Sequence, residues 1–307
     1  MAKQTVSGVL LLNKPQGISS HTALNQAKRL FMSADFDSKK AGHTGTLDPM
    51  ATGLLPICLG EATKFSSFGL NADKGYSAVI KLGEQTDTGD QEGQSLNILP
   101  VMPFDQHGLD ELAKQLTGER YQTPPMYSAL KKDGKKLYEY ARDGIQIERE
   151  ARPIVIHNLN LTKLSDDEIH LSVICSKGTY VRVLGESVAE GLGTVGHLTA
   201  LHRISTGGFE VADAVTLDEL GHLSFNERFA KLLPIDALLT HLSIVVLNHQ
   251  ETLRIKMGQR LNVKDRMTAS EFGDDTCQVR LYCDGDFVGL GVIEASGRLQ
   301  PIKVVQR

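Results

Sequence analysis

The stretch AGHTGTLDPMATGLLP, residues 41–56, is the most informative part of this chain. It places one carboxylate, Asp48, among residues that restrict or free the backbone: Gly42, Gly45, Pro49 and Gly53. Glycine and proline interrupt regular structure and fix tight turns, so Asp48 is predicted to lie on a shaped loop. A lone Asp in a loop is commonly only a turn former or a helix cap, whereas loops of this kind also present reactive groups. The stretch by itself leaves both interpretations open.

Further motifs extend on both sides of this loop. They are NKPQGIS (13–19), KGY (74–76), TPPMYSALKKDGKKLYEYAR (123–142), CSKGTYVRVLGESVAEGLG (175–193) and LTALHRISTGGF (198–209). Together with the Asp48 loop, and in the same order, they resemble the TruB family of tRNA pseudouridine synthases. The resemblance covers roughly the first two hundred residues. Each motif alone is weak, but several in register are specific.

Local patterns favour an α+β fold. Apolar alternation or short apolar runs predict strands over 7–12, 54–59, 76–82 and 169–175, and helical spacing predicts helices over 20–31, 109–116 and 180–192. Ser20 is a plausible helix cap, and Thr216 with Glu219 forms a possible capping box. Asp284-Gly285 predicts a β-hairpin. Since regular helical crossovers are missing, we expect a mixed, mainly antiparallel sheet with flanking helices and insertions.

The resemblance divides the chain into two domains. Residues 1–242 would form the catalytic domain, with a basic RNA-contacting insertion at about 123–152. Residues 243–307 would form a PUA-like RNA-binding module, a small β-barrel; a plain stabilising β-subdomain is the alternative.

Composition limits the function classes. The 307 residues are 41% hydrophobic and 23% charged, which is ordinary for a soluble globular protein, and no apolar run could span a bilayer. We therefore expect a cytoplasmic protein without a membrane partner. The net charge of −4 argues against coating nucleic acid by bulk charge but allows a local basic face.

No cofactor or metal motif is recognisable. The four cysteines form no C-x-x-C pair and no cluster with zinc-ligand spacing, so buried free thiols are expected. Residues 191–196 satisfy G-x-G-x-x-G, but they follow a predicted helix and would cap its C-terminus instead of binding a dinucleotide. We expect no metal and no small-molecule cofactor.

The resemblance implies roles for several residues. Asp48 would be the nucleophile, attacking either the ribose or the uracil ring, and Arg182 would pair with it through a planar guanidinium able to bind a carboxylate at two points. Tyr76 would stack on the flipped uracil and serve as the late proton acceptor. The remaining members of the predicted uridine site are Tyr180, Leu201 and Lys14.

RNA contacts are predicted outside the pocket. His43 would occupy the stack that the flipped base vacates, with a phosphate contact as its competing role. Lys131, Lys132, Lys135 and Lys136 suit a phosphate backbone, although a solvated helix face is the plain alternative. The implied substrate is the T arm of tRNA at uridine 55, bound by a monomer.

Two other function classes are alternatives to an isomerase. An RNA-binding or chaperone protein could use the same scaffold, with tRNA folding either replacing or accompanying the isomerisation. A hydrolase could use Asp48 with His43, but it would need a water-positioning group or a metal site that the sequence does not show.

Overall fold

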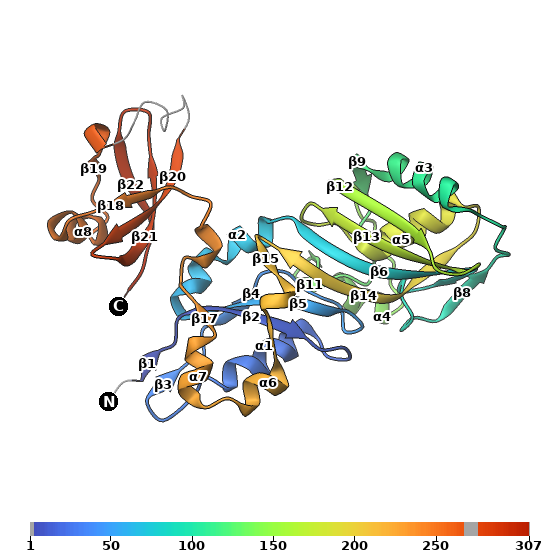
Figure 1. Cartoon of the computed structure of the whole chain (residues 1–307), viewed down its shortest axis with the longest axis horizontal. Helices are drawn as coiled ribbons and strands as arrows, with labels where there is room; N and C mark the ends of the chain where they lie inside the picture. The colour runs from blue at the N-terminus through green and yellow to red at the C-terminus, as the bar shows by residue number, and fades with distance from the viewer. Residues whose placement is uncertain (1–2, 267–275, 307) are drawn as a thin grey trace.

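The computed structural model describes residues 3–266 and 276–306. The outermost ends of the two predicted domains, residues 1–2 and 307, and the segment 267–275 lie outside the described residues. A large curved sheet runs along one end of the molecule and a smaller curled sheet stands at the other (Figure 1). The predicted α+β class, with a mixed, mainly antiparallel sheet, is confirmed.

The large sheet has eleven strands. Its main path runs in the order β16 (Val215–Thr216), β2 (Gly8–Lys14), β5 (Thr52–Leu59), β14 (Gly196–Thr206), β6 (Lys74–Leu82), β13 (Glu168–Cys175), β12 (Arg152–Lys163) and β9 (Gly118–Gln122). Three short strands attach at its sides: β4 (Ala41–His43), β15 (Phe209–Glu210) and β17 (Leu232–Leu233). Along the main path, β14 pairs in parallel with β5 and β16 in parallel with β2, and the other pairs are antiparallel.

The central strands are apolar because both of their faces are covered. β2 and β5 are buried almost throughout, whereas β6 alternates between buried and half-buried positions over Ser77–Leu82. The four predicted strands are found, each with slightly shifted ends. Smaller two-stranded sheets pair β1 (Gln4–Thr5) with β3 (Phe36–Asp37) and β7 (Glu84–Thr86) with β8 (Ser95–Ile98).

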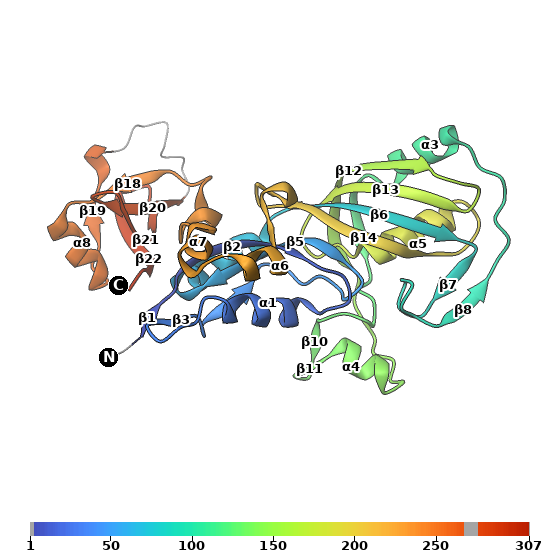
Figure 2. The same ribbon diagram turned by 60° about the horizontal axis from the view of Figure 1, so that its bottom comes forward.

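Helices cover the sheet at both ends. They are α1 (Ser20–Arg29), α2 (Ser66–Asn71), α3 (Gln106–Leu116), α4 (Leu137–Arg142), α5 (Val181–Gly191), α6 (Leu217–His222), α7 (Phe225–Ala230) and α8 (His249–Lys256). In Figure 2, α1, α6 and α7 lie beside β2 and β5, while α3 and α5 lie at the opposite end near β12 and β14. No described helix is long and apolar enough to cross a membrane.

Three predictions about helix ends can be checked. Thr216 and Glu219 form the predicted capping box at the start of α6. Gly193, at φ +74°, follows the end of α5, so G-x-G-x-x-G terminates a helix as expected. The Ser20 cap was wrong: Ser19 caps α1 by accepting a hydrogen bond from the Thr22 amide, and Ser20 is buried elsewhere.

The basic insertion leaves the sheet between β9 and β12. Its lysines lie on a two-stranded hairpin, β10 (Lys131–Lys132) and β11 (Lys135–Lys136), followed by α4. Figure 2 shows this unit projecting away from the sheet. The lysines therefore do not lie on a helix face, although Lys131 and Lys132 are exposed to solvent, and an RNA contact remains a prediction. Asp133 and Gly134 both have positive φ, the conformation of a tight two-residue hairpin turn.

The C-terminal module is a curled five-stranded sheet with α8 beside it. Its order is β18 (Ile244–Val246), β20 (Cys277–Cys283), β21 (Asp286–Ile293), β22 (Arg298–Val304) and β19 (Leu261–Asn262). The predicted Asp284-Gly285 hairpin joins β20 to β21. The division at residue 242 remains a prediction.

The module is packed against the rest of the chain. The rings of Phe65 and Phe287 meet edge to face at 5.4 Å between centroids. Lys64 donates to the Val304 carbonyl at 2.7 Å, and Lys303 donates back to the Lys64 carbonyl. The two parts therefore share a small apolar core closed by hydrogen bonds.

Candidate active site

The Asp48 loop connects β4 to β5 and is shaped by close backbone packing. Gly53 has φ +101°, and a Cβ at that position would lie 2.4 Å from the carbonyl oxygen of Arg203. A side chain there would force β5 away from β14, so only glycine fits. The predicted loop is found, and Asp48 lies between two bends of the backbone, at residues 44–45 and 49–50.

Buried polar groups hold the loop on both sides of Asp48. The Ser20 hydroxyl accepts a hydrogen bond from the Leu47 amide at 2.7 Å and donates to the Leu47 carbonyl at 2.8 Å. On the other side, the Pro49 carbonyl accepts from the Gly17 amide at 2.8 Å and from Lys14 at 3.4 Å. The backbone around Asp48 is thus fixed by residues of the NKPQGIS motif and the first turn of α1.

Arg182 forms the principal contact of the Asp48 carboxylate. Its Nε lies 2.9 Å from Asp48 Oδ2 and 3.7 Å from Asp90 Oδ2. Its terminal nitrogens donate elsewhere, to the carbonyls of Thr88 and Tyr127. The expected two-point binding of the carboxylate is therefore not present. Instead, the guanidinium, only 4% exposed, is oriented by backbone acceptors so that Nε faces Asp48.

The electrostatic balance at Asp48 has opposing contributions. Burial raises the pKa of the Asp48 carboxyl above its usual value, and the nearby Asp90 carboxylate raises it further. The Arg182 guanidinium and the Lys14 ammonium lower this pKa again. Since a third of the Asp48 side chain is still exposed, the carboxylate remains accessible to a ligand.

A cavity of about 310 Å³ opens beside Asp48. The residues predicted from the resemblance that line it are Asp48, Tyr76, Tyr180, Leu201 and Arg182. They come from the Asp48 loop, β6, α5 and its preceding residue, and β14, which the sheet order brings together. This volume falls in the range typical of small-molecule sites.

Tyr76 lies in the wall of the cavity on β6 and is 7% exposed. Burial raises the pKa of its phenol, while the Arg203 guanidinium acts in the opposite direction. Burial likewise raises the pKa of Tyr180, the residue directly before α5. Both rings are therefore held as neutral phenols with apolar faces at neutral pH.

Lys14 and His43 lie outside the lining of the cavity. Lys14 is buried and donates to the Pro15 and Ile18 carbonyls at 2.8 and 2.7 Å, and burial lowers its pKa to about 8. His43 is half-buried on β4 with its Nδ1 lacking a described partner, and burial and the Arg203 charge lower its pKa. His43 is therefore mainly neutral at physiological pH.

Sequence reasoning missed three residues of this site. Arg203 is fully buried, donates to the Leu54 carbonyl at 2.6 Å and to the Gly45 carbonyl at 3.2 Å, and lines the cavity. Lys74 also lines it, and burial lowers its pKa to about 8. Asp90 lies behind Arg182 and is 4% exposed. Arg203 and Lys74 stand inside the quoted motifs, whereas Asp90 carries no sequence signal.

The insertion lysines differ in their surroundings. Lys135 forms an ion pair with Asp143 at 2.5 Å and lies over the Tyr140 ring, and Lys136 lies over the Tyr138 ring. Lys131 and Lys132 are exposed on β10. The hairpin therefore presents two solvated cations beside two that are already engaged with neighbours.

Two family models match this chain. The model for the N-terminal domain of the TruB family pseudouridylate synthases matches residues 33–181, and the model for the C-terminal region of TruB pseudouridine synthase II matches residues 243–305. A curated relative from Psychrobacter cryohalolentis is 47% identical and covers 99% of this chain and 95% of its own length. This chain belongs to the TruB family of pseudouridine synthases. It is accordingly an isomerase, as the resemblance implied.

Other TruB relatives agree. A protein of Aromatoleum aromaticum is 48% identical, over 99% of this chain and 94% of its own, and one of Neisseria gonorrhoeae is 46% identical over 94% and 91%. All three relatives carry the name tRNA pseudouridine synthase B.

Solved structures show the same fold at lower identity. A chain in a crystal structure of a Cbf5-Nop10-Gar1 complex matches with a TM-score of 0.69 at 22% identity, covering 98% of this TruB family chain and 84% of its own. A chain from an H/ACA RNP bound to a substrate RNA containing 2′-deoxyuridine matches with a TM-score of 0.67 at 20% identity, covering 98% and 84%.

Proposed function

We propose that this protein converts uridine 55 in the T loop of tRNA to pseudouridine, with Asp48 as the nucleophile. The names of the curated relatives support tRNA as the substrate. The observation that carries the proposal is the 2.9 Å contact between Arg182 Nε and Asp48 at the edge of a cavity large enough for a nucleoside. The Arg182 guanidinium lowers the Asp48 pKa that burial raises, which favours the ionised form that a nucleophile requires.

The reaction needs little more than this carboxylate and a site that holds the uracil after it is released from the ribose. The bond between uracil N1 and ribose C1′ breaks, the base turns, and a bond forms between uracil C5 and C1′. The proton on C5 leaves and N1 gains one, so the overall change is an isomerisation. Asp48 attacks either C1′ or the uracil ring, and the same carboxylate position serves both routes.

Tyr76, Tyr180 and Leu201 would hold the base during its rotation. Their side chains line the cavity on β6, before α5 and on β14, and an aromatic face stacks on uracil without ionisation. Because burial raises the pKa of Tyr76, its phenol is protonated at rest. Stacking is therefore its first role; to accept the C5 proton the phenol must first lose its own proton to solvent, a loss that the neighbouring Arg203 charge favours.

The target nucleotide must leave its stack to reach Asp48. His43 is the last residue of β4, directly before the Asp48 loop, and its lowered pKa favours a neutral ring. A neutral imidazole suits stacking against nucleotides better than a phosphate contact. We therefore assign His43 to the vacated position in the RNA stack.

The remaining parts would bind the T arm. The hairpin of Lys131, Lys132, Lys135 and Lys136 projects from the sheet and offers phosphate contacts. We assign residues 243–307 to a PUA-like RNA-binding module beside the catalytic domain of 1–242. A monomer in the cytoplasm suffices for this activity, and a tRNA-folding role would use the same surface.

The hydrolase alternative finds less support. No hydrogen bond or ion pair joins His43 to Asp48 among the described residues, and Asp48 is instead paired with Arg182. A carboxylate whose charged form is favoured by a guanidinium fits a nucleophile better than a general base sharing a proton with histidine.

Mapping pseudouridine nucleotide by nucleotide in an unmodified tRNA transcript tests the proposal. The parent protein should convert uridine 55, and a transcript with cytidine there should remain unmodified. Asp48→Asn should bind tRNA with parent-like affinity and form no product, because the amide keeps the shape but not the nucleophile. Turnover by this variant, after deamidation is excluded, would refute the mechanism.

A further inference from the structure

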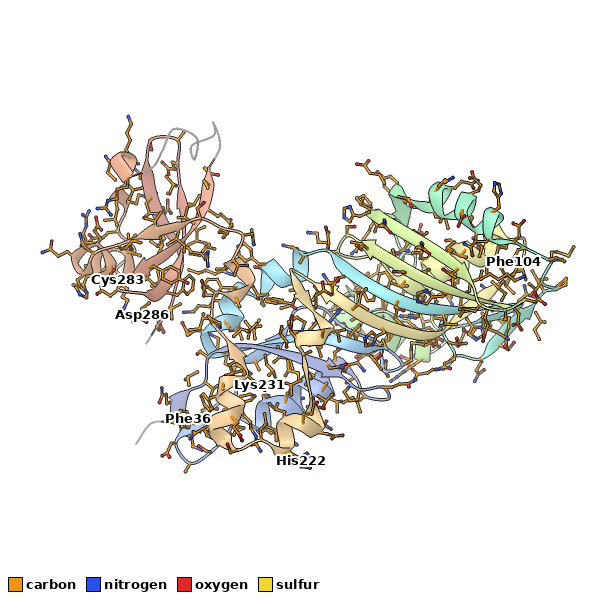
Figure 3. The ribbon with its side chains drawn as sticks, in the orientation of Figure 1. Phe36, Phe104, His222, Lys231, Cys283 and Asp286 are labelled. Atoms are coloured by element: carbon orange, nitrogen blue, oxygen red, sulfur yellow. The ribbon has the colours of Figure 1, made fainter. Side chains whose placement is uncertain are left out.

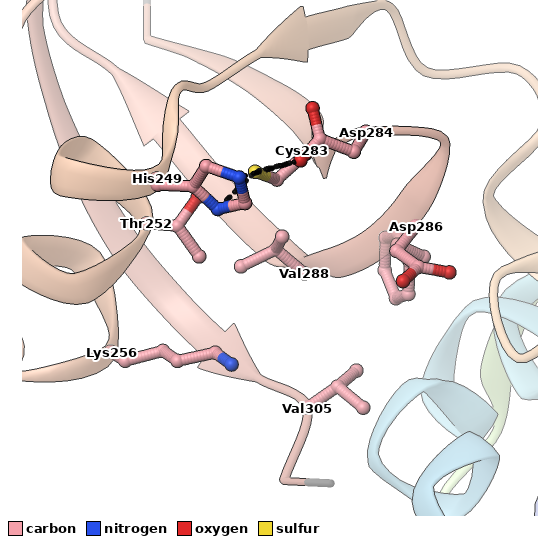
Figure 4. A pocket seen from close by; sticks show the side chains of 9 residues that line it. His249, Thr252, Lys256, Cys283, Asp284, Asp286, Val288 and Val305 are labelled. Atoms are coloured by element: carbon pink, nitrogen blue, oxygen red, sulfur yellow. Dashed lines mark hydrogen bonds and ion pairs between the residues drawn. The ribbon is translucent and has the colours of Figure 1, made fainter.

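A second group of reactive side chains lies in the C-terminal module, far from Asp48. His249 begins α8, Cys283 ends β20, and Asp284 opens the turn to β21. Figure 3 places Cys283 in the curled sheet at the opposite end of the molecule from Phe104, and Figure 4 shows the three side chains converging. None of the chemistry proposed above uses them.

The distances suit a small cation. His249 Nε2 lies 3.0 Å from Asp284 Oδ2, and Cys283 Sγ lies 3.9 Å from His249 Nδ1 and 3.8 Å from Asp284 Oδ2. One ligand atom from each residue lies within 4.8 Å of the others. Tetrahedral zinc, with bonds of about 2.0–2.3 Å, sets its ligand atoms about 3.3–3.8 Å apart. A modest turn of the exposed imidazole therefore completes three ligands.

A buried hydroxyl gives independent support. Thr252, one turn after His249 on α8, is 9% exposed, and its Oγ1 has no hydrogen-bond partner among the described residues. It lines a cavity of about 180 Å³ together with His249, Cys283 and Asp284, and Figure 4 shows its hydroxyl directed toward the imidazole. A buried acceptor without a partner is costly unless something donates to it, and a water bound to a cation is a strong donor.

We propose that His249, Cys283 and Asp284 bind a borderline-soft divalent cation such as Zn²⁺, with a water in the fourth position donating to Thr252. Nitrogen, sulfur and oxygen ligands are those that zinc accepts. The thiol of Cys283 loses its proton to solvent when the metal binds. The cation would connect the start of α8 to the β20–β21 turn. The expectation of no metal rested on ligand spacing, which cannot show ligands brought together from positions 249 and 283.

Cobalt titration of the full-length protein without RNA tests the site. The protein is first stripped with a chelator and reduced, and Co²⁺ is then added in steps. The parent should bind one equivalent and show thiolate-to-cobalt charge-transfer absorption with ligand-field bands of tetrahedral intensity. Cys283→Ser should abolish the charge-transfer band. Its matched control is Cys277→Ser, in the same strand, which should leave the band unchanged.

Competition with Zn²⁺ then tests the other ligands. His249→Gln and Asp284→Asn should each weaken zinc binding at least about tenfold. Asn tolerates the positive φ of Asp284, so the turn is preserved, and thermal melts check the fold. No band in the parent, a band that persists in Cys283→Ser, or parent-like zinc affinity in His249→Gln would each overturn the proposal. Because no RNA is present, these outcomes are independent of isomerase activity.

Discussion

The side chain of Ser20 and the backbone of Leu47 exchange two hydrogen bonds, at 2.7 and 2.8 Å, immediately before Asp48. Ser20 is 2% exposed and belongs to α1, so this pair ties the Asp48 loop to the first turn of a helix. The helix is in turn packed on the sheet that carries the cavity. Packing in the core, passed on through Ser20, therefore fixes the position of the loop.

Ser20→Ala should lower kcat by about 10- to 100-fold with little change in KM, because small misplacements of a reacting group are costly. Folding stability should fall by about 1–3 kcal/mol, since the Leu47 amide loses its partner. Single-turnover kinetics and thermal melts measure both effects. Ser19→Ala is the matched control: losing the α1 cap should cost about 1 kcal/mol and leave kcat unchanged. Equal activity in the two variants would argue against positioning by Ser20.

Arg182→Lys should reduce kcat by about 100-fold or more although the positive charge is retained. The ammonium cannot face Asp48 while also donating to the Thr88 and Tyr127 carbonyls, so its direction is lost. Single-turnover rates on tRNA measure the effect. Arg120→Lys, on the surface of β9, should behave like the parent. A parent-like rate for Arg182→Lys would contradict the proposed pairing.

The pH dependence of kcat/KM should have an acid limb above the ordinary carboxyl pKa, because burial raises the pKa of Asp48 and only the ionised form attacks. Activity should therefore fall as the pH drops through this raised value. In Asp90→Asn a neighbouring negative charge is removed, the pKa of Asp48 falls, and the limb should move to lower pH. An unmoved limb in this variant would show that the limb does not report Asp48.

The insertion lysines should contribute unequally to tRNA binding. Replacing Lys131 and Lys132 by Gln should flatten the dependence of log affinity on log salt by up to about 0.7–0.9 per phosphate contact. Replacing Lys135 and Lys136 should change it less, since Lys135 is paired with Asp143. Melting temperatures should hardly move. Lys114→Gln on α3 is the control, and identical slopes in all variants would remove the hairpin from the RNA interface.

Much of the site was predictable because its residues stand in ordered motifs. The fold brings Asp48, Tyr76, Tyr180, Arg182 and Leu201 together around one cavity, while Lys14 and His43 lie outside its lining, and the roles of all of them remain predictions. What no motif could show is orientation: Arg182 uses Nε alone toward Asp48 because two backbone carbonyls, distant in sequence, occupy its other nitrogens.

Other features were missed for different reasons. Asp90 sits in a polar turn that resembles many solvent-exposed turns, and only the folded chain buries it behind Arg182. The hairpin at Asp133-Gly134 carries the same signal that correctly predicted the turn at Asp284-Gly285. Its flanking lysines lack the apolar alternation of a strand, so composition favoured an exposed helix face.

The contact of Phe65 with Phe287 has a practical consequence for anyone cutting this protein into pieces. A fragment ending near residue 242 would expose the Phe65 ring, which Phe287 covers in the full chain. It would also leave Lys64 without its hydrogen bond to the Val304 carbonyl. Such a fragment should aggregate and be poorly soluble when expressed alone. The start of the C-terminal family match at residue 243 is therefore a poor position at which to truncate the protein, and the two parts are best produced as one chain.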